Sequence, residues 1–241
     1  MFKNLLIKWK LATLVAALLI ALGAIGFSGY SGIREVDHFL DDIGTVRLPS
    51  VEGLLVVSEG QTAVKSATLE TAIYENNYKA QKDFVGVIEL RKKAWANIQT
   101  GWKIYEPLPQ TKEEAVLWKQ FEADWESWKR ADDQLGGIVE KLSVNSSEPE
   151  QKALFVVFFE QFLASRPLFD KAEASLLKVV DLNKSLSTES VKAGSEQVAS
   201  AQRNMLLMGI GALVISIAFA AYITISITTP LHQAVRVSNS L

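Results

Sequence analysis

The stretch TKEEAVLWKQFEADWESW, residues 111–128, decides the fold class. Thr111 stands three residues before Glu114, which is the pattern of a capping box that opens a helix. Large aromatic side chains then recur at steps of three and four, so that they share one face of an α-helix: they are Trp118, Phe121, Trp125 and Trp128. This spacing makes them core residues by default, because each ring can bury a large apolar area, and an aromatic ligand box is the alternative.

Turn signals divide the surrounding sequence into four helices. Pro107 and Pro109 end the helix before this stretch, because proline lacks the donor of the helical ladder and restrains the residue before it. Residues 75–78, ENNY, suit a tight reversal, since asparagine tolerates left-handed backbone. Residues 143–147, SVNSS, make the third break, and Ser147 with Glu150 has the spacing of a second capping box. The helix that follows has no strong stop before Pro230. Short connections make neighbouring helices antiparallel, so we expect an all-α, up-down-up-down four-helix bundle.

Two uncharged stretches flank the bundle. Between Lys10 and Arg34 lie 23 residues without a formal charge, and between Arg203 and Arg236 lie 32. Each is long enough for one helix of about 20 apolar residues to cross a bilayer. We therefore expect transmembrane helices at 11–33 and 204–229, continuous with the first and last helices of the bundle. A cleaved signal peptide is the alternative for the first stretch, but a signal core has only about 7–15 apolar residues.

The charges indicate how the chain is oriented. All 27 acidic residues lie in the segment 34–203, which holds 21 of the 25 basic residues and so has a net charge of −6. The end segments, 1–10 and 230–241, carry only basic charges, and the positive-inside rule places them in the cytoplasm. We expect a two-pass protein of the bacterial inner (cytoplasmic) membrane, with both termini cytoplasmic and the domain 34–203 in the periplasm.

The composition excludes several classes of function. Cysteine is absent, so the chain has no disulfide, no thiolate metal site and no thiol nucleophile. The two histidines, His38 and His232, lie at opposite ends, which makes a paired-histidine metal site improbable. No basic surface for nucleic acid is present. We expect no enzyme activity, no cofactor and no nucleic-acid partner.

Polar residues interrupt the apolar row of the first bundle helix. Gln61, Lys65 and Thr68 stand where a plain bundle would have Leu or Val. They form either a homodimer seam, which tolerates polar residues at some cost in stability, or one side of a ligand cleft between two first helices and a fourth helix. By the rise per residue, Lys65 is level with about Phe158, and Arg166 lies lower on the fourth helix. These five residues are our candidate ligand-binding site, although Arg166 also suits an ordinary ion pair.

Three segments carry a resemblance to a known family: MFKNLLIK at 1–8, WKIYEPLP at 102–109 and ITTPL at 227–231. Together with the layout, the chain resembles the sensor half of a methyl-accepting chemotaxis receptor, with residues 230–241 as the truncated start of a HAMP linker. The resemblance implies a homodimer that binds a small ligand, such as an organic acid, or a ligand-loaded periplasmic binding protein. It also implies that a small displacement of the fourth helix and second span reaches the HAMP and signalling module.

Other output modules are compatible with the same input. The sensor half of a histidine kinase or of a cyclic-dinucleotide synthase is the alternative from the enzyme class, and a membrane-anchored structural bundle is a third. In the chemoreceptor case, kinase and adaptor contacts are expected only through the cytoplasmic part that would follow Leu241. Pro230, placed as in a HAMP linker, argues against the structural bundle.

Overall fold

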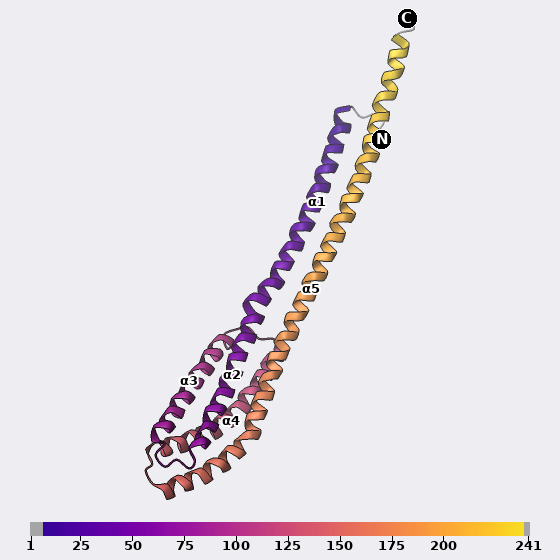
Figure 1. The fold of residues 1–241 in the computed structure, drawn as a ribbon. Helices are drawn as coiled ribbons and strands as arrows, with labels where there is room; N and C mark the ends of the chain where they lie inside the picture. The colour runs from indigo at the N-terminus through magenta and orange to yellow at the C-terminus, as the bar shows by residue number, and fades with distance from the viewer. Residues whose placement is uncertain (1–6, 239–241) are drawn as a thin grey trace. The chain divides into compact units, whose positions relative to one another are not determined.

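The computed structural model describes residues 7–238, and within them it contains helices and turns but no strand. Lys3 of the expected basic tail, and residues 239–241 of the expected HAMP start, lie outside the described residues. The helices in chain order are α1 (Ile7–Asp41), the π-helical turn η2 (Asp42–Arg47), α2 (Leu48–Glu70), the 3-10 turn η3 (Thr71–Tyr74), α3 (Gln81–Tyr105), α4 (Lys112–Val144) and α5 (Glu148–Ser238) (Figure 1). The expected all-α fold with a four-helix bundle is confirmed.

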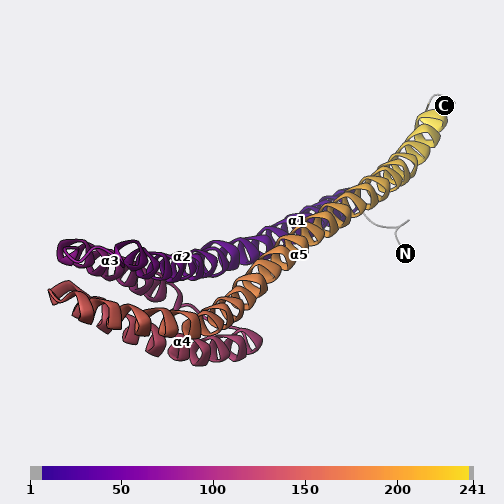
Figure 2. The same ribbon diagram turned by 60° about the horizontal axis from the view of Figure 1, so that its bottom comes forward.

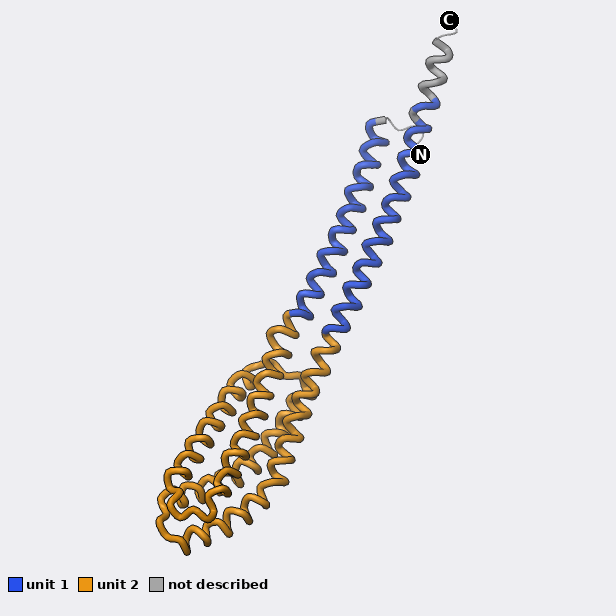
Figure 3. Tube along the Cα trace, in the orientation of Figure 1, with its two compact units in different colours: residues 1–40, 191–241 blue, residues 41–190 orange. Residues whose placement is uncertain are grey.

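The chain divides into two compact units, which Figure 3 colours separately. Residues 41–190 form the bundle, made of α2, α3, α4 and the first part of α5. Residues 1–40 and 191–241 form the second unit, in which α1 pairs with the rest of α5. Both α1 and α5 contain a stretch that is long and apolar enough to cross a membrane, judged by length and composition.

Glycines let α2 and α3 approach closely, and the two helices lie side by side in Figures 1 and 2. A Cβ added at Gly101 of α3 would stand 2.5 Å from the carbonyl oxygen of Gly53 on α2. A Cβ added at Gly60 would stand 2.5 Å from the Ile98 side chain. No real Cβ fits at these distances, so the packing of this helix pair depends on residues that have none.

The helix ends follow the turn signals, with one exception. The predicted capping box is confirmed: the Glu114 backbone N–H donates to Thr111 Oγ1 at 3.1 Å, and the Thr111 N–H donates to the Glu114 carboxylate at 3.3 Å. The break at 143–147 is also confirmed, but Ser147 and Glu150 do not form a second box among the described hydrogen bonds. Instead the Asn145 side chain accepts from the Ser147 N–H at 2.9 Å and donates to the Ser147 carbonyl at 2.9 Å.

The helix changes form just before Pro49, and α2 begins at Leu48. The chain passes from α1 into α2 through the π-helical turn η2, and the N–H of Leu48 donates to the carbonyl of Ile43, five residues earlier. Proline at the start of α2 cannot donate and its ring would clash with the carbonyl four residues back in a regular α-helix. A wider π-turn avoids this clash while keeping the chain helical.

Aromatic side chains fill the interior of the bundle. One buried cluster joins the four helices through the middle of the bundle and includes the predicted core face of α4, since Trp118, Phe121, Trp125 and Trp128 are all buried. Trp95 and Trp102 of α3 pack against it. A second cluster surrounds Phe84, Phe155 and Phe158 near the turns at the far end. The core interpretation of the aromatic spacing is thus confirmed.

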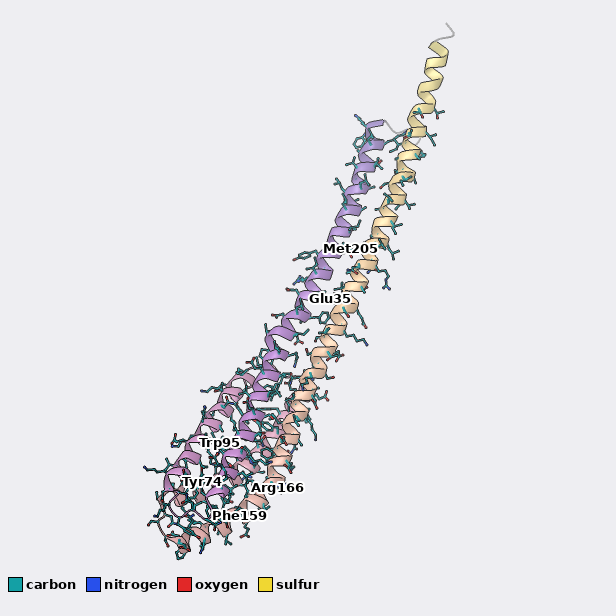
Figure 4. The ribbon with its side chains drawn as sticks, viewed as in Figure 1. Glu35, Tyr74, Trp95, Phe159, Arg166 and Met205 are labelled. Atoms are coloured by element: carbon teal, nitrogen blue, oxygen red, sulfur yellow. The ribbon has the colours of Figure 1, made fainter. Side chains whose placement is uncertain are left out.

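Small residues also mediate the pairing of α1 with α5 in the other unit. A Cβ added at Gly32 would stand 2.8 Å from the Ala201 side chain, and one at Gly29 would stand 3.2 Å from the Met205 methyl group. Glu35 and Gln197 are hydrogen-bonded at one end of this pair. At the other end Lys10 donates to the hydroxyl of Ser226 at 3.0 Å. Figure 4 labels Glu35 and Met205 on these two helices.

Gly101→Ala should lower the free energy of unfolding by about 1–3 kcal/mol, because the added methyl group overpacks the α2–α3 contact. Helix propensity alone predicts the opposite, a gain of about 1 kcal/mol. Gly86→Ala is the matched control on the same helix, since a Cβ there meets nothing within 4 Å, and it should be neutral or stabilising. Denaturant unfolding of the full chain in detergent, followed by circular dichroism, measures both. Equal effects of the two substitutions would contradict the close-packing argument.

Candidate functional site

A small cleft lies between α2, α4 and α5 and collects three of the five predicted site residues: Lys65, Thr68 and Arg166. The volume open to the centre of a water molecule is about 10 Å³, which is room for about one water. Figure 4 labels Arg166 on α5, beside the bundle core. The remaining lining residues are mainly aromatic or polar: Trp128, Asp132, Leu135, Phe162, Ser165 and Phe169.

Two cations stand at this cleft. The Lys65 ammonium lies 3.8 Å from the centroid of the Phe169 ring, a cation–π contact. Arg166 is exposed, and no salt bridge to it occurs in the part of the chain that the structure describes. The expected ion pair for Arg166 is therefore absent from the described residues. Neither cation has a carboxylate within ion-pair distance among the described residues.

A buried ion pair forms one wall of the cleft. Arg91 donates to both carboxylate oxygens of Asp132, at 3.0 and 2.8 Å, and both side chains are buried. Burial raises the pKa of Asp132, and the Arg91 charge opposes that shift. The hydroxyl of Thr68 accepts a hydrogen bond from Arg91 and donates to the Val64 carbonyl at 2.8 Å. Thr68 therefore supports the wall of the cleft and has no hydrogen to offer to a ligand.

The sequence contained a signal for Arg91. It stands on the apolar face of the second bundle helix, between Val87 and Trp95, where a charge needs a buried partner. The partner could not be identified from the sequence, because the face of α4 opposite this position carries Asp132 next to Asp133, and spacing alone does not choose between two adjacent carboxylates.

The other two predicted site residues lie elsewhere. Phe158 is fully buried in the far-end cluster with Phe84 and Phe155. Gln61 is also fully buried, and neither its amide nitrogen nor its amide oxygen has a hydrogen-bond partner among the described residues. An unpaired amide in an apolar core lowers the free energy of unfolding. Gln61 is thus a destabilising residue for which the described contacts offer no compensation.

A second polar cluster, at the end of the bundle where α3 turns into α4, was missed by the sequence analysis. Its centre is the fully buried carboxylate of Glu114. It accepts from Arg47 of η2 at 3.2 Å, from the hydroxyl of Tyr105 at 2.9 Å and from the amide of Asn183 on α5 at 2.7 Å. Burial and the bond to this carboxylate raise the pKa of Tyr105. We call Arg47, Tyr105, Glu114 and Asn183 the base cluster.

The described residues contain no group of three or more His, Asp or Glu side chains placed to hold a metal ion. The cleft presents two cations beside aromatic side chains. The base cluster presents a buried carboxylate with three side-chain donors, which suits the fixing of helix positions.

Gln61→Leu should raise the free energy of unfolding by about 1–3 kcal/mol, since it removes a buried amide that has no partner and keeps a similar volume. Gln99→Leu makes the same change at an exposed position of α3, and should alter stability by less than about 0.5 kcal/mol. Denaturant unfolding of the full chain measures both. A loss of stability in Gln61→Leu would mean that the amide is paired in solution.

The fold agrees with a comparison to protein families. A family model described as a four helix bundle sensory module for signal transduction matches residues 4–198. No curated protein and no solved structure gives a significant match. The matched range contains all of α2, α3 and α4, the cleft and the base cluster. The chain therefore belongs to the family of four-helix-bundle sensory modules of methyl-accepting chemotaxis-type signal transduction proteins.

Proposed function

We propose that this chain is the input half of a transmembrane chemoreceptor, which binds a small extracytoplasmic ligand and passes a helix displacement to a cytoplasmic HAMP and signalling module. The observation that carries the proposal is helix continuity. α5 runs unbroken from Glu148 in the bundle to Ser238, through a stretch apolar enough to cross a bilayer. A helix that is continuous across a membrane can carry an axial step from one side to the other.

The cleft is the proposed ligand site. Lys65 and Arg166 would neutralise a carboxylate, and Phe162, Phe169 and Trp128 offer apolar surface to the rest of a small organic acid. The described volume is too small for such a ligand, so binding requires α5 to move away from α2. A ligand that binds this wider packing better than the described one would shift the equilibrium toward it.

A second copy of the chain is the proposed partner, through the outer face of α2. Exposed side chains recur there every seven residues, and three of the four are leucine: Leu48, Leu55, Thr62 and Leu69. The half-buried residues Val51, Ser58, Lys65 and Ala72 follow each by three, as in a heptad seam. The polar and apolar row of α2 therefore faces two directions. Leu54, Gln61 and Thr68 face the protomer's own core, whereas Lys65 belongs to the seam. Lys65 stands where seam and cleft meet.

The same input domain is compatible with another output. A histidine kinase or a cyclic-dinucleotide synthase is the second candidate, and residues beyond 241 would distinguish them. The proposed location is the bacterial inner membrane, with the bundle in the periplasm. It is supported by the two apolar helices and by the restriction of acidic residues to the segment between them.

Leu69→Lys should weaken self-association of the full chain about tenfold or more, because each copy loses one buried leucine and gains a charge at the seam. Val85→Lys is the control, since Val85 of α3 has the same 48% exposure as Leu69 but lies outside the heptad row. Mass photometry in nanodiscs measures the fraction of dimers against concentration. A wild-type chain that stays monomeric, or equal loss in both variants, would refute this seam.

A small carboxylate that binds the cleft should raise the thermal unfolding midpoint of the full chain in nanodiscs, because ligand that binds only the native state stabilises it by mass action. We expect a hit in a panel of organic acids, amino acids and aromatic acids. Lys65→Ala should reduce the affinity for that hit about tenfold, while Lys129→Ala, which removes an exposed lysine beside Trp95, should leave it unchanged. Equal affinity in all three proteins by calorimetry would move the site away from the cleft.

A further inference from the structure

The π-turn η2 is fastened to α5 at both of its ends. At its last residue, Arg47 donates to the side-chain oxygen of Asn183 at 3.2 Å. At its first residue, Asp42 accepts from the hydroxyl of Ser190 at 3.1 Å. Arg47 Nε also donates to Asp42 at 3.4 Å, so the two ends of the turn are joined to each other. Residues nearly 150 positions apart in the chain are thereby held in one hydrogen-bonded group.

The pairing of Asp42 with Arg47 depends on the π-turn itself. In an α-helix each residue turns the chain by about 100°, so two residues five apart point about 140° away from each other. In a π-turn the hydrogen bonds join residues five apart, as the Leu48–Ile43 bond does here, and residues five apart lie on one face. Only the π form therefore presents both Asp42 and Arg47 to α5.

The two helical forms of this turn have opposing penalties. The π form has poorer backbone geometry than an α-helix, which is why it is rare and occurs as single turns. The α form would place the ring of Pro49 against the carbonyl of Thr45, without a hydrogen bond between them. Neither form is strongly favoured by the local chain, so the contacts with Asn183 and Ser190 decide between them.

We propose that η2 is a phase switch in the first helix, held in its π form by α5. When α5 moves and the bonds to Asn183 and Ser190 break, η2 relaxes to an α-helix. The number of residues is unchanged, so the helical phase of the chain before Asp42 changes by about one residue, or about 100°. A movement of α5 therefore also produces a rotation of the first helix. This device goes beyond the proposed function and needs no ligand.

The test measures helical phase along the first helix of the full chain in nanodiscs. The chain has no cysteine, so spin labels attached through Asp37→Cys and Glu52→Cys report one distance across η2. Both positions are exposed. A side-chain tip about 5 Å from the helix axis moves by about 8 Å when the phase changes by about 100°. We expect Ser190→Ala and Asn183→Leu to shift the distance, or to add a second maximum, by about 2–5 Å.

Two controls make the result specific. Thr188→Ala changes α5 two residues before Ser190. The Thr188 hydroxyl donates to the Lys184 carbonyl of its own helix, so this substitution should leave the distance unchanged. Asp42→Ala should give the same shift as Ser190→Ala, and combining them should add nothing. Wild-type distances in both Ser190→Ala and Asn183→Leu would overturn the proposal, as would an equal shift in Thr188→Ala or additive shifts in the double variant.

Discussion

One buried carboxylate joins all four helices of the bundle. Glu114 on α4 receives hydrogen bonds from the first helix through Arg47, from α3 through Tyr105 and from α5 through Asn183. Burying a carboxylate without hydrogen-bond donors would be strongly unfavourable. The helices therefore have to be placed so that all of these donors reach Glu114. Apolar packing allows helices to slide by small steps, whereas a polar cluster resists such a step until its hydrogen bonds break. The axial positions of the helices at this end follow from that requirement.

Much of the fold could be predicted from the sequence. Prolines 107 and 109, the asparagines of the reversal and the Thr111–Glu114 box mark local events, and local chemistry decides them without knowledge of the partner helix. The capping box predicted at Ser147 does not form, because the side chain of the nearby Asn145 makes competing hydrogen bonds with the Ser147 backbone. The π-turn was not predicted: Pro49 disfavours a regular α-helix there, but the sequence does not show that Asn183 and Ser190, more than a hundred residues away, bond to its two ends.

The candidate site was predicted only in part, because spacing does not give the direction of each side chain around the helix axis accurately enough. Spacing shows that Gln61, Lys65 and Thr68 share a side of α2, but that side is wide, and its two edges face different surroundings. Gln61 and Thr68 turn toward the protomer's own core, while Lys65 stands at the edge. Lys65 points only about 40° away from Gln61 and about 60° away from Thr68, which is enough to separate interior from seam but too little to be read from the spacing. The lengthwise estimate was inaccurate, because it placed Arg166 well below Lys65, whereas both line one cleft and Lys65 contacts Phe169.

The tryptophans give the bundle an optical property of its own. Five of the six lie together on α3 and α4, with ring centroids 4.8 Å apart for Trp125 and Trp128 and 5.0 Å apart for Trp102 and Trp118. Indoles at such separations couple electronically, so the near-ultraviolet dichroism and emission of the whole chain come mostly from the joint between these two helices. Only Trp9 stands apart, exposed on α1. Spectroscopy of the unlabelled protein therefore observes mainly how α3 packs on α4.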